Sequence, residues 1–165
     1  MALTKLNPAS VIERLPTGSV LQTKQGERTT RFISTSGTTF VDCGVSVNIT
    51  PKSTSSDILI TVQGTLSNES NNGEECRVIL FRGSTEIGGG TGGSSTNDFM
   101  TTLPTQVYNM YPFSNSFLDS PSTISEITYK IQVASGSAND VALGGRGDTT
   151  NSAVPTRITV QEIKG

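Results

Sequence analysis

The sequence has no His and no Trp, only two Cys, and few aromatic residues, which make up 5% of its 165 residues. Without His, neither a Ser-His-Asp nor a Cys-His catalytic arrangement can be built, and no zinc site can use imidazole. The net charge is only −2 and no block of basic residues is present, so neither nucleic acid nor an anionic membrane is expected as a partner. These absences predict a protein that is not an enzyme and needs no cofactor or metal.

Long apolar runs are also missing. Nowhere do about 18 apolar residues follow one another, so no transmembrane helix is expected. Glu13 and Arg14 interrupt the most apolar part of the N-terminus, which therefore does not resemble a secretory signal. The length suits one domain, which at this size buries about 70% of the surface that its unfolded chain exposes.

The two cysteines, Cys43 and Cys76, lie too far apart in sequence for a redox or zinc motif of the Cys-x-x-Cys type. Two interpretations are open. The pair bridges two strands if the protein meets an oxidising compartment, or both residues are free thiols that pack as small core residues. The second interpretation is preferred.

What the sequence does contain is a period of two in its apolar residues. The clearest alternating sets are Val45, Val47 and Ile49; Ile58, Ile60 and Val62; and Ile127, Tyr129, Ile131 and Val133. Alternation of this kind is typical of half-buried strands, because successive side chains of a strand point to opposite faces. Strands are expected over residues 18–25, 28–34, 38–43, 45–50, 57–67, 76–83, 85–88, 105–118, 126–134 and 156–163.

Turns rich in Ser, Thr, Asn and Gly separate these runs. Many short strands joined by polar turns predict an all-β fold, an antiparallel two-sheet sandwich. A jelly-roll-like arrangement is the leading architecture. An immunoglobulin-type sandwich is less favoured, because its buried Trp is missing.

A short N-terminal arm, residues 1–16, is expected to precede the β-sandwich domain at residues 17–165. Pro8 and Pro16 break regular structure in the arm. Its apolar side chains are too many for a solvated tail, so we expect the arm to anchor on its own domain or on a neighbouring chain; a frayed terminus is the alternative. The predicted anchoring residues are Leu3, Leu6, Val11, Ile12 and Leu15.

A cluster of aromatic residues lies in the stretch QVYNMYPFSNSF at 106–117. Aromatic residues and Met are enriched at protein interfaces, but the same residues also fill protein cores, and core packing is the larger alternative. The predicted subunit-interface residues are Tyr108, Met110, Tyr111, Phe113 and Phe117.

The remaining motifs do not indicate a binding or catalytic site. Gly88, Gly90 and Gly93 fit the spacing GxGxxG, but no helix-forming sequence follows, so a flexible loop is expected. Arg146-Gly147-Asp148 is a tripeptide that some cell-surface receptors recognise, interpreted here as a chance occurrence in a turn. Asp42 and Glu162 interrupt the alternation of two strands, so either carboxylate is a candidate to point inward. Two such carboxylates could form a catalytic pair, but a contact with an Arg between subunits is the preferred explanation.

Beyond single motifs, the order of several strings is informative. They are LPTGSVLQTK at 15–24, TTFVDCGVSVNITPKSTSSDILITVQGTLS at 38–67, RVILFRGSTEIG at 77–88, SFLDSPSTISEITYKIQV at 116–133 and RITVQEI at 157–163. In this succession the chain resembles small jelly-roll virion proteins and fibre-tip domains of tailed bacteriophages, especially those of marine bacteria and cyanobacteria. These domains are similar in style to the trimeric heads of C1q/TNF-type proteins.

The resemblance implies a virion structural protein on the particle exterior, made in the host cytoplasm and assembled as a homotrimer with other virion proteins as partners. It brings no catalytic residues. An arm of 16 residues spans at most about 55 Å, which favours a capsid decoration protein that stabilises or coats the head. A tail- or head-fibre tip that binds a host surface receptor is the alternative, and a glycan-degrading enzyme is a weaker one.

Overall fold

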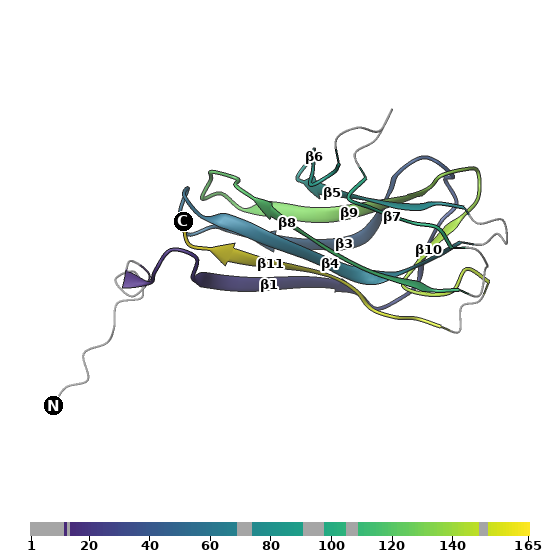
Figure 1. The fold of residues 1–165 in the computed structure, drawn as a ribbon, viewed down its shortest axis with the longest axis horizontal. Coiled ribbons are helices and arrows are strands. Elements are labelled where there is room, and N and C mark those ends of the chain that lie inside the picture. Colours follow the sequence, from purple (N-terminus) through teal and green to yellow (C-terminus); the bar gives the residue numbers. More distant parts are fainter. Residues whose placement is uncertain (1–11, 13, 69–73, 91–97, 105–108, 149–151) are drawn as a thin grey trace.

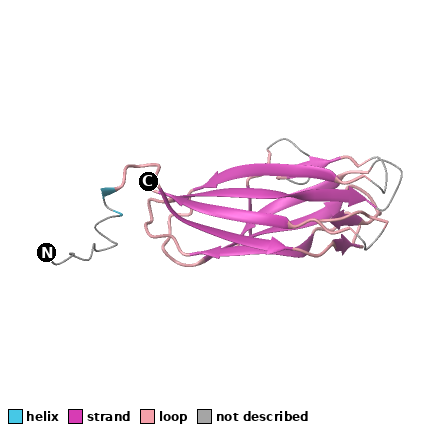
Figure 2. Ribbon diagram, turned by 90° about the horizontal axis from the view of Figure 1, so that it is seen from below, coloured by secondary structure: helices cyan, strands magenta, loops and turns pink. Residues whose placement is uncertain are grey.

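The computed structural model describes residues 12, 14–68, 74–90, 98–104, 109–148 and 152–165. These residues form eleven strands in two layers, and the segment that follows the arm lies at the same end of the molecule as the C-terminus (Figures 1 and 2). Within this part of the chain, no helix has the length and apolar character needed to cross a membrane.

Sheet A has four principal strands, which are, in hydrogen-bonded order, β1 (Val20–Arg28), β11 (Thr156–Ile163), β4 (Asp57–Asn68) and β8 (Tyr111–Asp119). Two short strands extend it, because β10 (Val141–Leu143) pairs with the last residues of β4 and β2 (Phe32–Ser34) pairs with β10. Every pair is antiparallel.

Sheet B consists, in hydrogen-bonded order, of β3 (Val41–Ile49), β9 (Ile127–Ser135), β5 (Cys76–Arg82) and an edge shared by β6 (Thr85–Ile87) and β7 (Met100–Thr102). Both edge segments pair with β5, β6 with its last residues and β7 with its first. These pairs are also antiparallel.

The order of the principal strands is that of a jelly roll. With β6 and β7 counted as one, sheet A contains the first, eighth, third and sixth principal strands, and sheet B the second, seventh, fourth and fifth. Among the connections between successive principal strands, only the β5–β6 hairpin stays within one sheet, and the others cross from one layer to the other. The predicted antiparallel two-sheet sandwich of jelly-roll type is therefore confirmed.

The core lies between the two sheets and is filled by the alternating residues that the sequence indicated. Val45, Ile60, Val62 and Ile131 are fully buried there. The pleat directs every second side chain outward, so the residues that alternate with these core residues along each strand form the two outer faces of the sandwich.

The strands predicted at 28–34 and 105–118 begin later, at Phe32 and Tyr111. Three further corrections change the number of strands. The strands predicted at 38–43 and 45–50 are a single strand, β3 (Val41–Ile49), in which the register shifts between Asp42 and Ser46 and Gly44 has a φ of +73°. Gly adopts this left-handed conformation without steric cost, which permits a bulge where a turn was expected. The other two corrections are additions, β7 and β10, whose three residues each are too few to show a period.

Both cysteines are free and buried, as the preferred interpretation held. The Cys43 thiol donates to the carbonyl of Ile131 at 3.4 Å, and the Cys76 thiol donates to that of Ser67 at 3.5 Å. Burial raises the pKa of Cys43 to about 11 and that of Cys76 to about 12. Both residues are thus protonated core residues at neutral pH.

We expect both thiols to resist a water-soluble disulfide reagent at pH 8 and to react within seconds in denaturant, because thiolate is the reactive form. The unfolded chain ionises first as the pH rises, from about 9.0. The stability that the protonated thiols contribute is therefore complete below pH 9 and is lost as the pH rises toward 11 and above. Rapid labelling of the native protein at pH 8 would contradict this prediction.

Candidate functional site

One end of the sandwich, called here the arm end, is formed by residues 14–19, the loops 50–56 and 120–126, and the C-terminal residues 164–165. It holds a cavity of about 530 Å³. Apolar side chains contribute to its wall beside lysines and serines; the lining residues are Ile12, Leu21, Lys52, Ser53, Ser55, Lys164 and Gly165.

The segment that follows the arm is fixed to the last strand. The amide of Gly18 donates to the carbonyl of Lys164 at 2.7 Å, and the amide of Lys164 donates to the carbonyl of Ser19 at 2.8 Å. The ammonium group of Lys164 also donates to the carbonyl of Leu15 at 2.5 Å. These bonds make residues 15–19 continuous with sheet A.

Glu162 fixes the part of the cavity wall that contains Lys52. Its side chain is fully buried, and one carboxylate oxygen accepts from the Lys52 amide at 2.6 Å while the other accepts from the Gln22 side chain at 2.7 Å. Gln22 donates in addition to the carbonyl of Thr50 at 2.7 Å. The buried carboxylate therefore fixes the β3–β4 loop against β1 and β11.

For the two carboxylates singled out by sequence, the outcomes differ. Glu162 points inward, but its partners belong to its own chain and are neutral donors, not Arg. Asp42 points outward and pairs with Lys130 at 2.9 Å. Partial burial raises the pKa of Asp42, but hydrogen bonds from the Gly44 amide and from Lys130 outweigh it and hold that pKa below its usual value.

Three of the four exposed large apolar side chains of the described residues lie at the arm end. Val20 at the start of β1, Leu118 near the end of β8 and Ile124 in the following loop are each at least half exposed, at 50%, 52% and 60%. Leu103, which is 53% exposed, lies at the opposite end, beside the first residues of β5.

The predicted anchoring residues fall partly on this site. Ile12 is half-buried and lines the cavity, and Leu15 is half-buried beside the last strand. Leu3, Leu6 and Val11 lie outside the described residues. The anchoring role of all five remains a prediction, whereas Leu21, Lys52 and Lys164 belong to the cavity without having been singled out by sequence.

The predicted interface residues of the 108–117 stretch divide in a different way. Phe113 is 6% exposed and belongs to the protein's own core, and Phe117 packs against that core. For these two residues, core packing rather than a subunit interface is therefore what the structure shows. Met110 and Tyr111 are half-buried, and Tyr108 lies outside the described residues. Phe117 also accounts for the presence of Gly at position 88. A Cβ added to Gly88 would lie 3.0 Å from the Phe117 ring, and the φ of Gly88 is +71°.

A buried ionic contact that the sequence analysis missed joins the two sheets near the arm end. Asp119 in β8 is 7% exposed and accepts from Arg82 in β5 at 2.9 and 3.1 Å and from the Tyr129 hydroxyl in β9 at 2.7 Å. Burial and the bond to Asp119 raise the pKa of Tyr129. Phe113, Phe117 and Asp119 share a period of two, and this was the available signal that Asp119 points inward.

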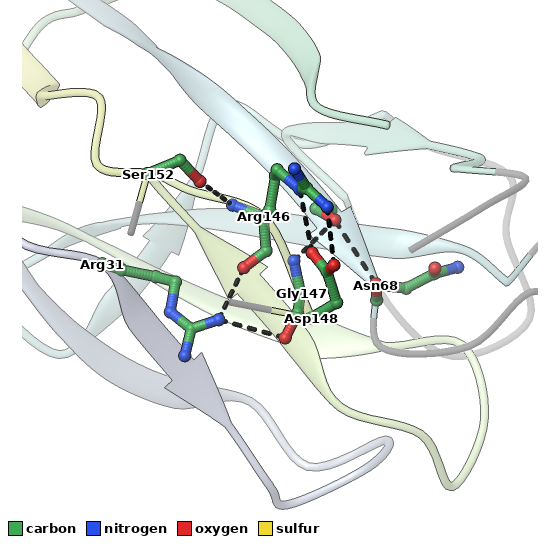
Figure 3. A network of polar contacts seen from close by, with 7 residues as sticks. Arg31, Asn68, Arg146, Gly147, Asp148 and Ser152 are labelled. Atoms are coloured by element: carbon green, nitrogen blue, oxygen red, sulfur yellow. Dashed lines mark hydrogen bonds and ion pairs between the residues drawn. The ribbon is translucent and has the colours of Figure 1, made fainter. Parts of the chain in front are cut away.

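The Arg146-Gly147-Asp148 turn is closed on itself (Figure 3). The Arg146 guanidinium donates two hydrogen bonds to the Asp148 carboxylate, at 2.9 and 2.6 Å. Arg31 donates to the carbonyls of Arg146 and Gly147 at 2.6 and 3.0 Å, and the Gly147 amide donates to the Ser67 hydroxyl at 3.1 Å. The tripeptide thus ties the β10–β11 connection to β4 and to Arg31, the residue before β2, and its two charged groups bind each other.

The outer face of sheet A is uncharged over most of its area. From β1 and β11 it presents Thr23, Gln25, Thr159 and Gln161. From β4 and β8 it presents Leu59, Thr61, Gln63, Ser114, Ser116 and Leu118. We call these ten residues the neutral face. Glu27 and Arg157 pair at 3.0 Å along its border.

The outer face of sheet B has a different character. Lys130 pairs with Asp42, and Arg77 in β5 pairs with Asp98 at 2.9 Å. Lys130 and Arg77 also lie over the rings of Phe81 and Phe40, with 5.9 and 5.3 Å to the centroids. Lys130, Asp42, Arg77 and Asp98 are therefore engaged with groups of their own chain.

Comparison with known proteins gives no family. No family model matches the chain, and no curated protein matches it. Similar chains occur in structures of infectious bursal disease virus. The chain in the Gt strain structure has 12% identity and a TM-score of 0.45, with 89% of the present chain and 39% of the viral chain covered.

Two further structures of this virus are similar. For its T=1 particles the identity is 11% and the TM-score 0.47, with 100% of the present chain and 41% of the viral chain covered. For its VP2 subviral particle the identity is 12% and the TM-score 0.42, with 88% and 38% covered. The present chain thus spans about two fifths of the length of these viral chains.

Proposed function

We propose that this protein is a structural protein on the exterior of a bacteriophage particle, a capsid decoration protein that stabilises or coats the head. The jelly-roll strand order supports the proposal, as does the succession of sequence strings over residues 15–163 that resembles small virion domains. The observation that carries it is the cavity at the arm end, which Ile12 of the arm and Leu21 line. Val20, Leu118 and Ile124 are exposed at the same end of the sandwich, on β1, on β8 and in the loop that follows β8.

In this proposal the arm end is the attachment surface. Full burial of an exposed large apolar side chain contributes roughly 1.5–3 kcal/mol. Val20, Leu118 and Ile124 are 50%, 52% and 60% exposed, so each contributes up to about half of this free energy to docking on another virion protein, and the arm contributes in addition. The protein acts by binding rather than by catalysis. It assembles as a homotrimer, is made in the host cytoplasm and resides on the particle surface.

The test uses the full-length chain with the apolar residues of the arm replaced by Ser, at Leu3, Leu6, Val11, Ile12 and Leu15. Purified wild-type and variant proteins are mixed with phage particles that lack the protein, and binding is measured by co-sedimentation. We expect the variant to lose at least 90% of binding. Leu103→Ser, which removes an exposed apolar side chain at the opposite end, is the matched control and should bind like the wild type.

Electron microscopy of particles with and without the protein then locates it. Additional density at many equivalent positions on the head supports decoration. Density confined to fibre tips would overturn decoration in favour of the receptor-binding alternative. Absence of the protein from purified particles would overturn the virion role altogether, and unchanged binding of the arm variant would overturn the role of the arm.

A further inference from the structure

The arm and the arm end together carry positive charge, although the whole chain has a net charge of −2. Residues 1–19, 50–56, 120–126 and 164–165 contain four basic side chains, Lys5, Arg14, Lys52 and Lys164, and two acidic ones, Glu13 and Glu126. They therefore carry +2, which leaves −4 for the rest of the chain.

The opposite end of the sandwich has the opposite charge. Its described connections contain two basic and four acidic side chains, Arg31 and Arg146 with Glu74, Glu75, Asp140 and Asp148 (Figure 1). A molecule whose charges are divided in this way is attracted with its arm end toward an acidic surface.

Within the arm end, Lys52 is the cavity's charged group that is open to a partner. Its side chain is exposed, it lines the cavity, and no ion pair between described residues includes it. Glu162 accepts from the main-chain amide of Lys52 at 2.6 Å, not from its ammonium group. The other lysine of the cavity, Lys164, donates to the carbonyl of Leu15. The lining residues include neither Asp nor Glu, so the cavity itself supplies no carboxylate side chain for Lys52.

Two hydroxyl groups and two apolar side chains complete the lining around Lys52. The hydroxyls of Ser53 and Ser55 lie 2.9 Å apart, and the Ser55 amide donates to the Ser53 hydroxyl at 3.1 Å. Two hydroxyls that share one hydrogen bond keep one proton to donate to a further acceptor. Ile12 and Leu21 supply the apolar part of the cavity. The cavity therefore combines one cation and a hydroxyl donor with apolar contact surface.

We propose that the cavity at the arm end receives an acidic segment of another virion protein. An Asp or Glu carboxylate of this segment binds Lys52 and the serine hydroxyls, and an adjacent apolar side chain contacts Ile12 and Leu21. The inference rests on the proposed function and identifies the chemistry of its partner. A carboxylate carries a single charge, as Lys52 does, whereas the phosphates of nucleic acid are bound by several basic side chains together, and this chain has no such block.

The test compares three variants of the full-length protein by co-sedimentation with phage particles that lack the protein. Lys52→Gln removes the charge and keeps the main-chain amide that binds Glu162, so the loop retains its support. Lys52→Arg keeps the charge. Lys24→Gln removes an exposed charge from β1 outside the cavity and is the matched control.

At low salt we expect Lys52→Gln to bind about tenfold more weakly than the wild type and the other two variants to differ from it by less than about twofold, because only the first leaves an enclosed carboxylate unpaired. The deficit of Lys52→Gln shrinks as added salt screens the charges. Circular dichroism checks that each variant is folded.

A water-soluble carbodiimide then identifies the group that Lys52 contacts on the particle, because it joins an amine to a carboxylate through an amide bond. Mass spectrometry of the digested complex is expected to show Lys52 joined to an Asp or Glu of another virion protein. Binding of Lys52→Gln equal to that of the wild type, or a Lys52 that is joined to no carboxylate in the bound protein, would overturn the acidic partner and leave attachment by the arm end standing. A wild type that does not bind the particles would overturn the proposed function itself.

Discussion

Replacing Asp119 with Ala is expected to lower the free energy of unfolding by about 3–5 kcal/mol, because the change leaves a buried cation contact without its partner. Asp119 links β8 in sheet A to Arg82 and Tyr129 in sheet B, through bonds of 2.7–3.1 Å. Arg82 is one-third exposed and recovers part of its hydration, which places the expected loss near the lower limit. The Tyr129 hydroxyl is fully enclosed and has no such compensation.

Chemical denaturation at fixed protein concentration, followed by far-ultraviolet circular dichroism, measures this loss. Asp42→Ala is the matched control, because it removes the same side chain from an ion pair with Lys130 in which the Asp42 side chain is 48% exposed. Exposed pairs contribute about 0–1 kcal/mol. If the two variants lost equal stability, the contact between Asp119, Arg82 and Tyr129 would not join the sheets as described.

Gly26→Ala is expected to destabilise the protein by about 3 kcal/mol. The closed edge of the sandwich brings β1 against β3, and a Cβ added to Gly26 would lie 1.8 Å from the carbonyl oxygen of Ser46. Because that atom belongs to the backbone of the opposite sheet, the clash can be relieved only by separating β1 from β3. The small stabilisation that Ala provides through the unfolded state does not offset this strain.

Gly90→Ala serves as the control for Gly26→Ala. No atom lies within 4 Å of the position that its Cβ would take, so a change of about 0.5 kcal/mol or less is expected. Thermal unfolding of the two variants beside the wild type provides the comparison. A Gly26→Ala protein as stable as the Gly90→Ala protein would contradict the close approach of the two sheets.

The alternating strands were predictable because the pleat is a local property. The spacing of Val45, Val47 and Ile49 places them on one face of any strand, and they are buried as expected. The bulge at Gly44 was not predictable, because it depends on the register of β3 against β9. The short strands β7 and β10 escaped notice because pairing with β5 and β4, rather than any period of their own, makes them strands.

The candidate site was only partly visible in the sequence. An arm rich in apolar residues indicated anchoring, and Ile12 does line the cavity at the arm end. The part of the cavity wall around Lys52 could not be predicted, because it depends on a hydrogen bond between Glu162 and Lys52, which lie more than one hundred residues apart in sequence. The neutral face could not be recognised either, since its members come from four strands whose adjacency is decided by pairing.

By itself, the sequence determined the class of the fold, the inward residues of each long strand and the exclusion of chemistry that requires His, because these depend on residue type and on local alternation. Only the tertiary structure decided which strands are neighbours, that Arg146 and Asp148 bind each other, that Phe113 faces the core, and that Asp119 meets Arg82 and Tyr129. The physical reason is that a jelly roll pairs strands far apart in sequence, and such contacts leave no periodic signal in the chain.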